Sequence, residues 1–212
     1  MKILVTGSSG GIGKAVVLKF LQAGHTVIGM DLLPAAVEHP CYRHEQRDIC
    51  GDLPPIEGLD ILVNNAGVQN DRDIEVNLQG TIHVTERYLH PGIKSVVFIA
   101  SASASTGAEF PEYAASKGGM VAYMKNVALR LAPYGATANA VSPGGVITDM
   151  NRHILQDESL YRRVLEETLL HKWALPEEIA EFVYFLSVVN QSMTGEDLLI
   201  DNGEKIKSNF IW

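Results

Sequence analysis

The stretch TGSSGGIG at residues 6–13 constrains the fold of this chain more than any other part of its sequence. It follows a short apolar run at residues 2–6 and precedes apolar residues that recur at helical spacing between Ile12 and Ala23. The expected order is therefore a buried strand, a glycine-rich turn and a helix. The unpaired N–H groups and the positive dipole end of such a helix favour a bound phosphate group.

Three of the four glycines in this stretch have an expected purpose. Gly7 permits the tight turn, Gly11 lets the backbone approach a ligand, and Gly13 lets the helix pack on the strand. The alternative is a glycine-rich turn that serves packing alone. The flanking strand and helix patterns favour phosphate binding over that alternative.

Strand and helix patterns alternate along the rest of the chain. This alternation implies right-handed crossovers and a parallel sheet covered on both faces. We therefore predict an α/β fold, a three-layer α/β/α sandwich of the Rossmann type with a doubly wound parallel sheet, as a single domain over residues 1–212. The segment 32–59 is rich in proline and glycine, so one brief strand near 42–47 and little helix are expected there. Further strands are expected at 25–31, 60–67, 94–101, 136–142 and 196–201, and helices at 71–90, 112–132, 157–170 and 176–189.

Composition excludes several classes of protein. A net charge of -8 without a basic stripe argues against nucleic-acid binding. The seven histidines are scattered, so no metal site is predicted, and Cys41 and Cys50 lack metal-ligand spacing and are expected to be reduced. No apolar run is long enough for a membrane span, and the first residues do not resemble a signal peptide. We expect a cytoplasmic protein with no membrane partner.

The sequence YAASK at 113–117 places a phenol and an amine four positions apart. On a helix, Tyr113 and Lys117 leave the same face, and the ammonium group favours the phenolate by lowering the tyrosine pKa. The same spacing also occurs in surface pairs that have no chemical role. The other motifs have to decide between these readings.

Asp31 ends the second expected strand, 18 residues after Gly13. A carboxylate at this position accepts hydrogen bonds from the ribose hydroxyls of an adenosine and repels a 2'-phosphate. Leu32 and Leu33 follow it, and Ser9 stands in the loop, so the cationic residues that usually accompany NADP are missing from these positions. NAD is the predicted cofactor and NADP the less favoured one. The alternative is that Asp31 only caps the strand end.

Five motifs in a fixed order resemble those of the short-chain dehydrogenase/reductase family. The resemblance runs from Lys2 to about Gly203. The family members that the chain resembles include the 3-oxoacyl-carrier-protein reductases and many polyol and steroid dehydrogenases. It implies the fold described above, a small-molecule alcohol or ketone substrate, and a homodimer or homotetramer. The motifs are TGSSGGIG at 6–13, NNAG at 64–67, VNLQG at 76–80, YAASK at 113–117 and VSPGGVIT at 141–148.

The resemblance implies a role for each catalytic residue. Tyr113 corresponds to the acid/base, and Lys117 to the residue that lowers its pKa and holds the nicotinamide ribose. Asn77 corresponds to the residue that anchors a water behind the lysine, although an isolated asparagine is more often a structural amide. Ser101 would orient the substrate oxygen. Ser103 is its rival, but Ser101 leaves eleven residues before the tyrosine and needs only a one-residue deletion relative to the family.

The resemblance also implies how the cofactor is held. The NNAG motif would shape the adenosine side, with Asn64 also bracing the central strand, and Asp48 with Ile49 would hold the adenine. The segment after the sixth strand would fix the nicotinamide carboxamide, unless it is an ordinary proline turn. The expected cofactor-binding residues are Gly7, Ser9, Gly11, Ile12, Gly13, Asp31, Asp48, Ile49, Asn64, Ala66, Gly67, Tyr113, Lys117, Pro143, Gly144, Val146 and Thr148.

The predicted function is reversible hydride transfer between NAD and a secondary alcohol or ketone, with Tyr113 as the acid/base. Residues 149–172 should form a small lid over the substrate. Its apolar residues line a partly apolar pocket or belong to the core, namely Met150, Ile154, Leu155 and Leu160. The alternative is a non-catalytic regulator that senses a dinucleotide, although such a protein would be expected to lose Tyr113 or Lys117. A lyase or dehalogenase is a third possibility, but the halohydrin type carries arginine in place of Lys117.

The chain is shorter than is usual in the family, with tightening in two regions. Residues 31–64 and 64–77 are expected to lose helix. Because those helices cover the sheet or join the subunit interface in the family, the usual tetramer is in doubt. A dimer through the helix that carries Tyr113 is an alternative, as is a four-helix association.

Overall fold

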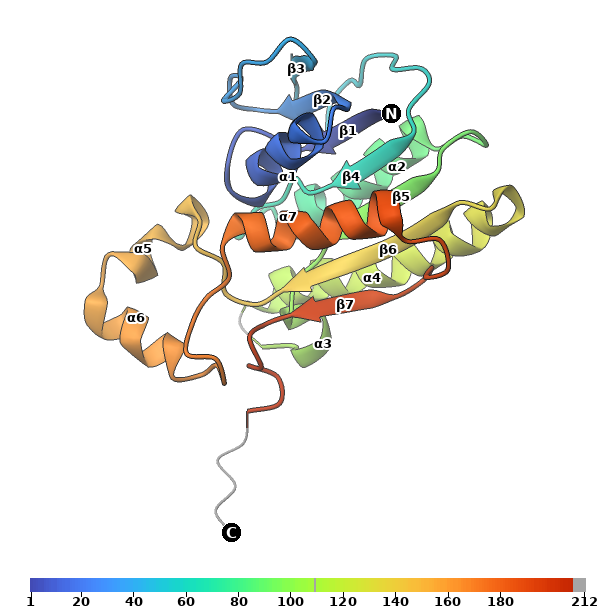
Figure 1. Cartoon of the computed structure of the whole chain (residues 1–212). Coiled ribbons are helices and arrows are strands. Elements are labelled where there is room, and N and C mark those ends of the chain that lie inside the picture. The colour runs from blue at the N-terminus through green and yellow to red at the C-terminus, as the bar shows by residue number, and fades with distance from the viewer. Residues whose placement is uncertain (109, 208–212) are drawn as a thin grey trace.

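The computed structural model describes residues 1–108 and 110–207 and confirms the predicted parallel sheet (Figure 1). Its strand order is β3-β2-β1-β4-β5-β6-β7, and every pairing is parallel. The direction of winding reverses between β1 and β4, which is the point where open α/β sheets bind ligands. The strands are β1 Lys2–Thr6, β2 Thr26–Asp31, β3 Tyr42–Gln46, β4 Ile61–Asn64, β5 Ser95–Ile99, β6 Thr137–Pro143 and β7 Asp197–Ile200.

Helices cover both faces of the sheet and produce the three predicted layers. Successive strand residues point to opposite faces, so Leu4 packs with α2 and α4, whereas Ile3 and Val5 pack with α1 and α7. Figure 1 shows α1 and α7 in front of the sheet and α4 behind it. The helices are α1 Gly11–Gln22, α2 Thr81–Tyr88, α3 Ser103–Thr106, α4 Pro111–Leu131, α5 Arg152–Leu155, α6 Glu158–Leu165 and α7 Pro176–Tyr184.

Three predicted helices differ from their observed counterparts. The helix expected at 71–90 begins with a π-helical stretch, η1, at Ile74–Gly80 and continues as α2. The helix expected at 176–189 likewise changes from α7 to a π-helical turn, η4, at Phe185–Val189. The helix expected at 157–170 ends earlier, because α6 stops at Leu165 and turns follow it. Segment 32–59 has one strand and no helix, as predicted.

Residues 149–172 form a separate small unit at one end of the sheet. They contain a 3₁₀ turn, η3, at Asp149–Asn151 together with α5 and α6, and Figure 1 shows them projecting beyond the carboxyl ends of β6 and β7. Asp157 caps α6 by accepting a hydrogen bond from the Leu160 N–H group (2.9 Å). Tyr161 makes an edge-on contact with Trp173, with ring centres 5.7 Å apart. In the part of the chain that is described, no helix has the length and apolar character needed to cross a bilayer.

Candidate active site

A cavity of about 600 Å³ opens at the carboxyl ends of the central strands. Its walls come from the segments that follow the seven strands, from helix α4 and from the segment 149–172. The residues predicted from the sequence that line it are Gly7, Gly11, Ile12, Asp31, Asp48, Ile49, Ala66, Gly67, Ser101, Tyr113, Lys117, Pro143, Gly144, Val146 and Thr148. The other four, Ser9, Gly13, Asn64 and Asn77, lie behind or beside the wall.

The glycine-rich loop is held in shape from beneath. Gly7 has a φ of 64°, a conformation that favours glycine, and its N–H group donates to the Met30 carbonyl (2.8 Å). A side chain at Gly13 would overlap the Gly7 carbonyl, so this glycine allows helix and loop to touch. The Asn65 amide donates to the carbonyls of Thr6 (2.9 Å) and Gly7 (3.0 Å). Asn65 was not predicted, although it stands in the quoted NNAG motif.

The first turn of α1 is suited to a phosphate group. It contains no acidic residue, and no described side chain caps its N-terminus at Gly10. Its backbone N–H groups therefore face the cavity with the positive end of the helix dipole. A Cβ atom at Gly11 would lie 3.2 Å from the Thr148 side chain, so the loop and the segment after β6 approach one another here. The residues present fit a dinucleotide pyrophosphate between them.

Asp31 organises the far end of the cavity. Its two carboxylate oxygens accept hydrogen bonds from the N–H groups of Ser9 (2.9 Å) and Leu33 (2.9 Å). The Arg47 N–H group donates to the Asp31 carbonyl (2.8 Å), and Arg47 also lines the cavity. Arg47 directly follows the adjacent strand β3, so the residues next to Asp31 in the sequence do not indicate it.

Asp48 and Ile49 form the floor beside this end. Asp48 accepts a hydrogen bond from the Cys50 N–H group (2.9 Å), and Ile49 is buried in the core. Arg72 lines the same region, where it pairs with Glu75 (2.7 Å) and has Asp48 and Cys50 among its charged or titratable neighbours. Arg72 therefore lies near Asp48, and Arg47 is joined through its backbone to Asp31.

Helix α4 carries the phenol and the amine at the other end of the cavity. The Nζ atom of Lys117 lies 5.7 Å from the centre of the Tyr113 ring, so the two side chains share one face of the helix. Lys117 is buried and donates to the Ile99 carbonyl at the end of β5 (2.9 Å). Burial lowers the Lys117 pKa to about 8, although the negative charge of Asp73 opposes the shift.

Asn77 holds the loop that follows the NNAG motif. Its amide oxygen accepts from the Val68 N–H group (2.8 Å), and its amide nitrogen donates to the Val68 carbonyl (2.9 Å) and to the Ser116 hydroxyl (3.1 Å). A Cβ atom at Gly67 would lie 3.1 Å from the Asn77 oxygen and 3.3 Å from the Lys117 amine. Asn77 thus lies behind the cavity, next to Lys117, within the π-helical stretch η1. Such stretches are frequent at functional sites.

The two candidate serines are hydrogen-bonded to each other. The Ser103 hydroxyl donates to the Ser101 hydroxyl (2.8 Å), and the Ser103 N–H group donates to the same oxygen (3.3 Å). Ser103 is buried, whereas Ser101 is half-buried, and both line the cavity. Because Ser101 accepts both bonds, its own hydroxyl hydrogen is free to point toward a ligand.

Three further positions depart from the sequence analysis. Asn64 is buried and donates to the Thr85 hydroxyl of α2 (2.9 Å), which agrees with the expected bracing of the central strand, but it does not line the described cavity as a cofactor contact would. Trp173 and Glu204 line the cavity but were not predicted. Glu204 follows β7, so the rule that ligands bind at the carboxyl ends of parallel strands could have identified it.

The chain is similar in sequence and in fold to several known proteins. Residues 55–205 match the family profile described as enoyl-(acyl carrier protein) reductase. The chain is 32% identical to a 3-oxoacyl-acyl-carrier-protein reductase of Aquifex aeolicus, with 94% of this chain and 95% of that protein covered. It is 28% identical to a glucose 1-dehydrogenase of Gluconobacter oxydans, with 99% and 93% covered. A crystal structure of a short chain dehydrogenase family protein from Francisella tularensis superposes with a TM-score of 0.86 at 28% identity, covering 97% of this chain and 99% of that one.

Proposed function

Because this chain belongs to the short-chain dehydrogenase/reductase family, we propose that it transfers a hydride reversibly between NAD and a secondary alcohol or ketone, with Tyr113 as the acid/base. The family makes it an oxidoreductase that uses NAD or NADP and a small-molecule substrate. The observation that carries the proposal is the Tyr113–Lys117 pair, which lines the same cavity as the glycine-rich loop.

The cavity offers a place for each part of the dinucleotide. Asp31 and the Asp48–Ile49 floor would receive the adenosine, and the first turn of α1 the pyrophosphate. Thr148, Gly144 and the buried amine of Lys117 would hold the nicotinamide ribose and ring. The bound cofactor supplies the hydride acceptor in oxidation and the hydride donor in reduction.

Proton transfer falls to the residues of this chain. In oxidation, the substrate loses its hydroxyl proton to the Tyr113 phenolate and a hydride from the carbinol carbon to the cofactor, and a carbonyl bond forms. The Ser101 hydroxyl donates a hydrogen bond to the substrate oxygen and orients it. The positive charge of Lys117 stabilises the phenolate, and Asn77 fixes the loop at Val68 beside Lys117.

NAD is the preferred cofactor in this proposal. The Asp31 carboxylate already accepts two backbone hydrogen bonds, which hold a negative charge where a 2'-phosphate would lie. Arg47 is the one described cation beside Asp31 on the cavity wall, so it would account for any residual use of NADP. We expect wild type to favour NAD in kcat/KM, Asp31→Ser to narrow that preference, and Arg47→Ala to lower the use of NADP.

The test is a spectrophotometric assay with NAD and NADP over secondary alcohols and ketones that include sugars and 3-oxoacyl thioesters. Tyr113→Phe should reduce kcat by on the order of a thousandfold, since a positioned acid/base contributes about 10²–10⁴. NADH binding, followed by fluorescence, should persist. Tyr123→Phe is the matched control on the same helix, because the Tyr123 hydroxyl donates to Glu86 away from the cavity.

Two results would contradict the proposal. Near wild-type turnover by Tyr113→Phe would remove the assigned acid/base. Tight NADH binding by wild type without turnover of any panel member would favour the regulator that senses a dinucleotide.

A further inference from the structure

A second buried charge lies near the amine of Lys117. Asp73 is 3% exposed and stands at the start of the π-helical stretch η1, four residues before Asn77. A Cβ atom at Gly67 would lie within 3.3 Å of both the Asn77 oxygen and the Lys117 amine, so these two groups are neighbours. The stretch η1 also packs directly on α4, the helix that carries Lys117. Asp73 is therefore one helical turn away from the residue beside the amine, and the proposed reaction gives it no role.

The loop before η1 holds this carboxylate in place. Its Oδ1 atom accepts a hydrogen bond from the Asn70 N–H group (3.0 Å), and the Asp73 N–H group donates to the Asn70 carbonyl (3.3 Å). The stretch η1 continues as α2, so the positive end of the helix dipole lies at Asp73 and favours the ionised carboxylate. The adjacent Arg72 pairs with Glu75 (2.7 Å), and both of these side chains are exposed. The negative charge of Asp73 is thus fixed by its local partners but not neutralised by them.

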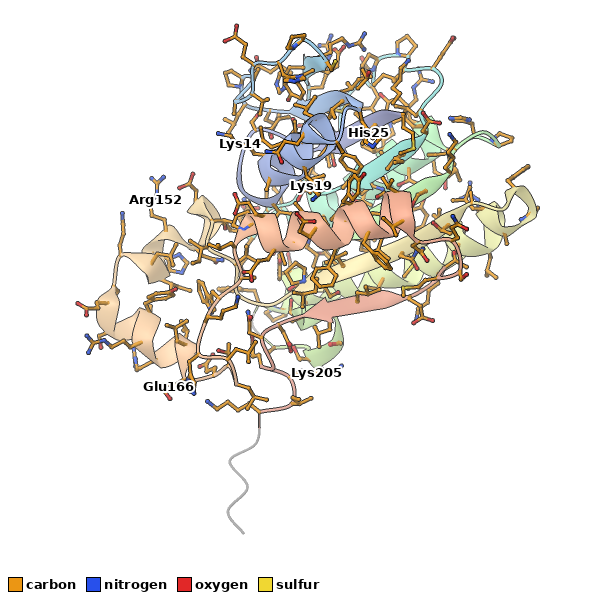
Figure 2. All side chains as sticks on the ribbon, viewed as in Figure 1. Lys14, Lys19, His25, Arg152, Glu166 and Lys205 are labelled. Atoms are coloured by element: carbon orange, nitrogen blue, oxygen red, sulfur yellow. The ribbon has the colours of Figure 1, made fainter. Side chains whose placement is uncertain are left out.

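Lys117 is the cation on which this charge acts. Its amine donates to the carbonyl of Ile99 (2.9 Å), which is a neutral partner. Burial lowers the Lys117 pKa to about 8, and the negative charge of Asp73 keeps it from falling further. Among the described residues, the titratable groups that face the amine are Tyr113 on its own helix and Asp73 on η1. The two lysines of α1 that are labelled in Figure 2 lie over the opposite face of the sheet.

The charge state of this amine decides whether the tyrosine can act as a base. An ammonium group stabilises the Tyr113 phenolate, whereas a neutral amine does not. After one proton has left the pair, it consists either of phenolate and ammonium or of phenol and neutral amine. A carboxylate near the amine favours the first of these forms, because it stabilises positive charge at Lys117. It also delays the loss of the ammonium proton as the pH rises.

We propose that Asp73 is a positioning residue of the active site, which acts through Lys117. It holds positive charge on the buried amine and so keeps the Tyr113 phenolate available as the base. This inference rests on the proposed function and adds a residue to it. Asp73 is not among the described residues of the cavity wall, so it acts by its charge and not by contact with the substrate. Removal of the charge should therefore change the pH dependence of the reaction.

The first test compares the pH dependence of kcat for alcohol oxidation in wild type and Asp73→Asn. Asparagine has nearly the same shape and offers an oxygen to the Asn70 N–H group, so the substitution removes the charge and keeps the loop. Asp73→Glu keeps the charge. Asp73→Ser, which also offers an oxygen there, is used if Asp73→Asn does not fold. Asp71→Asn is the matched control, because it removes an exposed carboxylate from the same loop.

We expect wild type and Asp73→Asn to have a similar kcat at about pH 6, where the amine is protonated in both. As the pH rises, Asp73→Asn should lose activity about one pH unit earlier than wild type, because loss of an opposite charge nearby changes a pKa by about that much. Its kcat should then be about a tenth of the wild-type value on the alkaline side. Asp73→Glu should restore the wild-type profile, and Asp71→Asn should leave it unchanged.

The second test measures the same charge interaction without turnover. The free energy of unfolding in urea is compared between wild type and Lys117→Met, and between Asp73→Asn and the double variant Asp73→Asn/Lys117→Met. In the wild-type background the difference should begin to rise with pH near the Lys117 pKa of about 8. In the Asp73→Asn background the rise should begin about one pH unit lower, because the folded amine loses its proton earlier.

The inference is overturned, with the proposed function intact, if alcohols are oxidised and the alkaline loss of activity occurs at the same pH in Asp73→Asn and wild type. An equal loss of kcat at every pH overturns it as well, because that result indicates a structural role. If wild type turns over no alcohol or ketone, the proposed function fails and the unfolding data decide whether Asp73 holds charge on Lys117. An onset of the rise at lower pH in the Asp73→Asn background supports this effect, and an unchanged onset overturns it.

Discussion

The hydroxyl groups of Ser101 and Ser103 are hydrogen-bonded to each other. Ser103 donates and Ser101 accepts, so we expect the two serines to have different roles. Ser101 accepts from both donors of Ser103 and keeps its own hydrogen for the cavity. We expect Ser101→Ala to lower kcat by about a hundredfold or more, because loss of one donor to the reacting oxygen costs that much. Ser103→Ala should cost about tenfold or less, because it removes one neutral hydrogen bond behind the reacting group. Steady-state kinetics of both variants measure this, and a larger loss for Ser103→Ala would reverse the assignment.

The buried amine of Lys117 makes stability depend on pH in a defined window. Its pKa is about 8 in the folded protein, against an ordinary value of 10.5. Between these values the unfolded chain binds more protons than the folded chain, so the free energy of unfolding rises with pH. The difference between the two pKa values is worth about 3 kcal/mol, since each pH unit corresponds to about 1.4 kcal/mol.

Urea denaturation of wild type and Lys117→Met at several pH values tests this directly. The free energy of unfolding of wild type should gain on that of the variant, by up to about 3 kcal/mol, as the pH increases from 8 to 10.5. Below pH 8 the difference should be flat. If the free energies of unfolding of wild type and Lys117→Met differ by the same amount at every pH, burial does not lower the Lys117 pKa.

At the scale of single residues, the sequence does not reveal side chains whose positions depend on which strands are neighbours in the sheet. The side of α4 that carries Tyr113 and Lys117 follows from helical periodicity, which is local. Arg47 and Glu204 reach the cavity because β3 and β7 end at the same edge of the sheet as β1, which depends on strand order. Asn65 supports the glycine-rich loop, whereas Asn64 bonds to Thr85 of α2. This difference depends on the side of the sheet to which each side chain points.

Whole elements were predicted where the apolar pattern was long and regular. All seven strands and the long helix α4 were expected near their observed positions. For the central strands the signal is a continuous apolar run, which is typical of buried parallel strands, whereas the polar strand β3 was placed only as a brief strand in a segment rich in proline and glycine. The π-helical stretch η1 was not expected, since one extra residue in a turn leaves no mark on a periodicity of 3.6. Its consequence is structural, because Asn77 lies in that stretch and accepts a hydrogen bond from the Val68 N–H group.

Among the elements, the packing of α6 in the predicted lid depends on few contacts and can be tested directly. No residue of α6 is fully buried, and the helix is held by the contact of Tyr161 with Trp173. An aromatic pair is worth about 1 kcal/mol, which corresponds to about a fivefold change in an equilibrium constant. Tyr161→Ala should therefore raise the substrate KM about fivefold and leave the NADH dissociation constant nearly unchanged. Arg162→Ala, whose side chain is exposed and pairs with Glu158 on the same helix, is the control. An equal effect of both variants on NADH binding would contradict a role confined to the substrate.

At the scale of the whole molecule, the described residues form a complete sheet although the chain is short. Residues 32–59 contain one strand and no helix, yet the sheet has seven strands and is covered by helices on both faces. The strands that frame the cavity are therefore all present. This explains why the fold could be predicted from an unusually short chain, whereas the association of subunits could not.

The outer surface carries apolar side chains that a monomer would leave in water. Phe182, Phe185 and Val189 follow one another at helical spacing on α7 and η4 and are 41%, 41% and 55% exposed. The neighbouring strand β7 ends the sheet, so its outer backbone groups have no strand partner among the described residues. On the other face of the sheet, Leu129 of α4 is 76% exposed. These two surfaces, one on each face, are the candidates for a homodimer or, used together, a homotetramer.

Light scattering on the purified protein distinguishes the possibilities. We expect wild type to have the mass of a dimer or tetramer and Phe185→Glu to lower that mass, because a charge in an apolar contact is left without a partner. If wild type is a tetramer and Leu129→Glu also halves its mass, both surfaces are subunit interfaces. If wild type is a dimer that Leu129→Glu dissociates and Phe185→Glu does not, the subunits meet through α4, the helix that carries Tyr113. Gln191→Glu, an exposed position just beyond η4, adds the same charge outside the apolar row and should leave the mass unchanged. A monomeric wild type at micromolar concentration would mean that the exposed row on α7 and η4 is not a subunit contact.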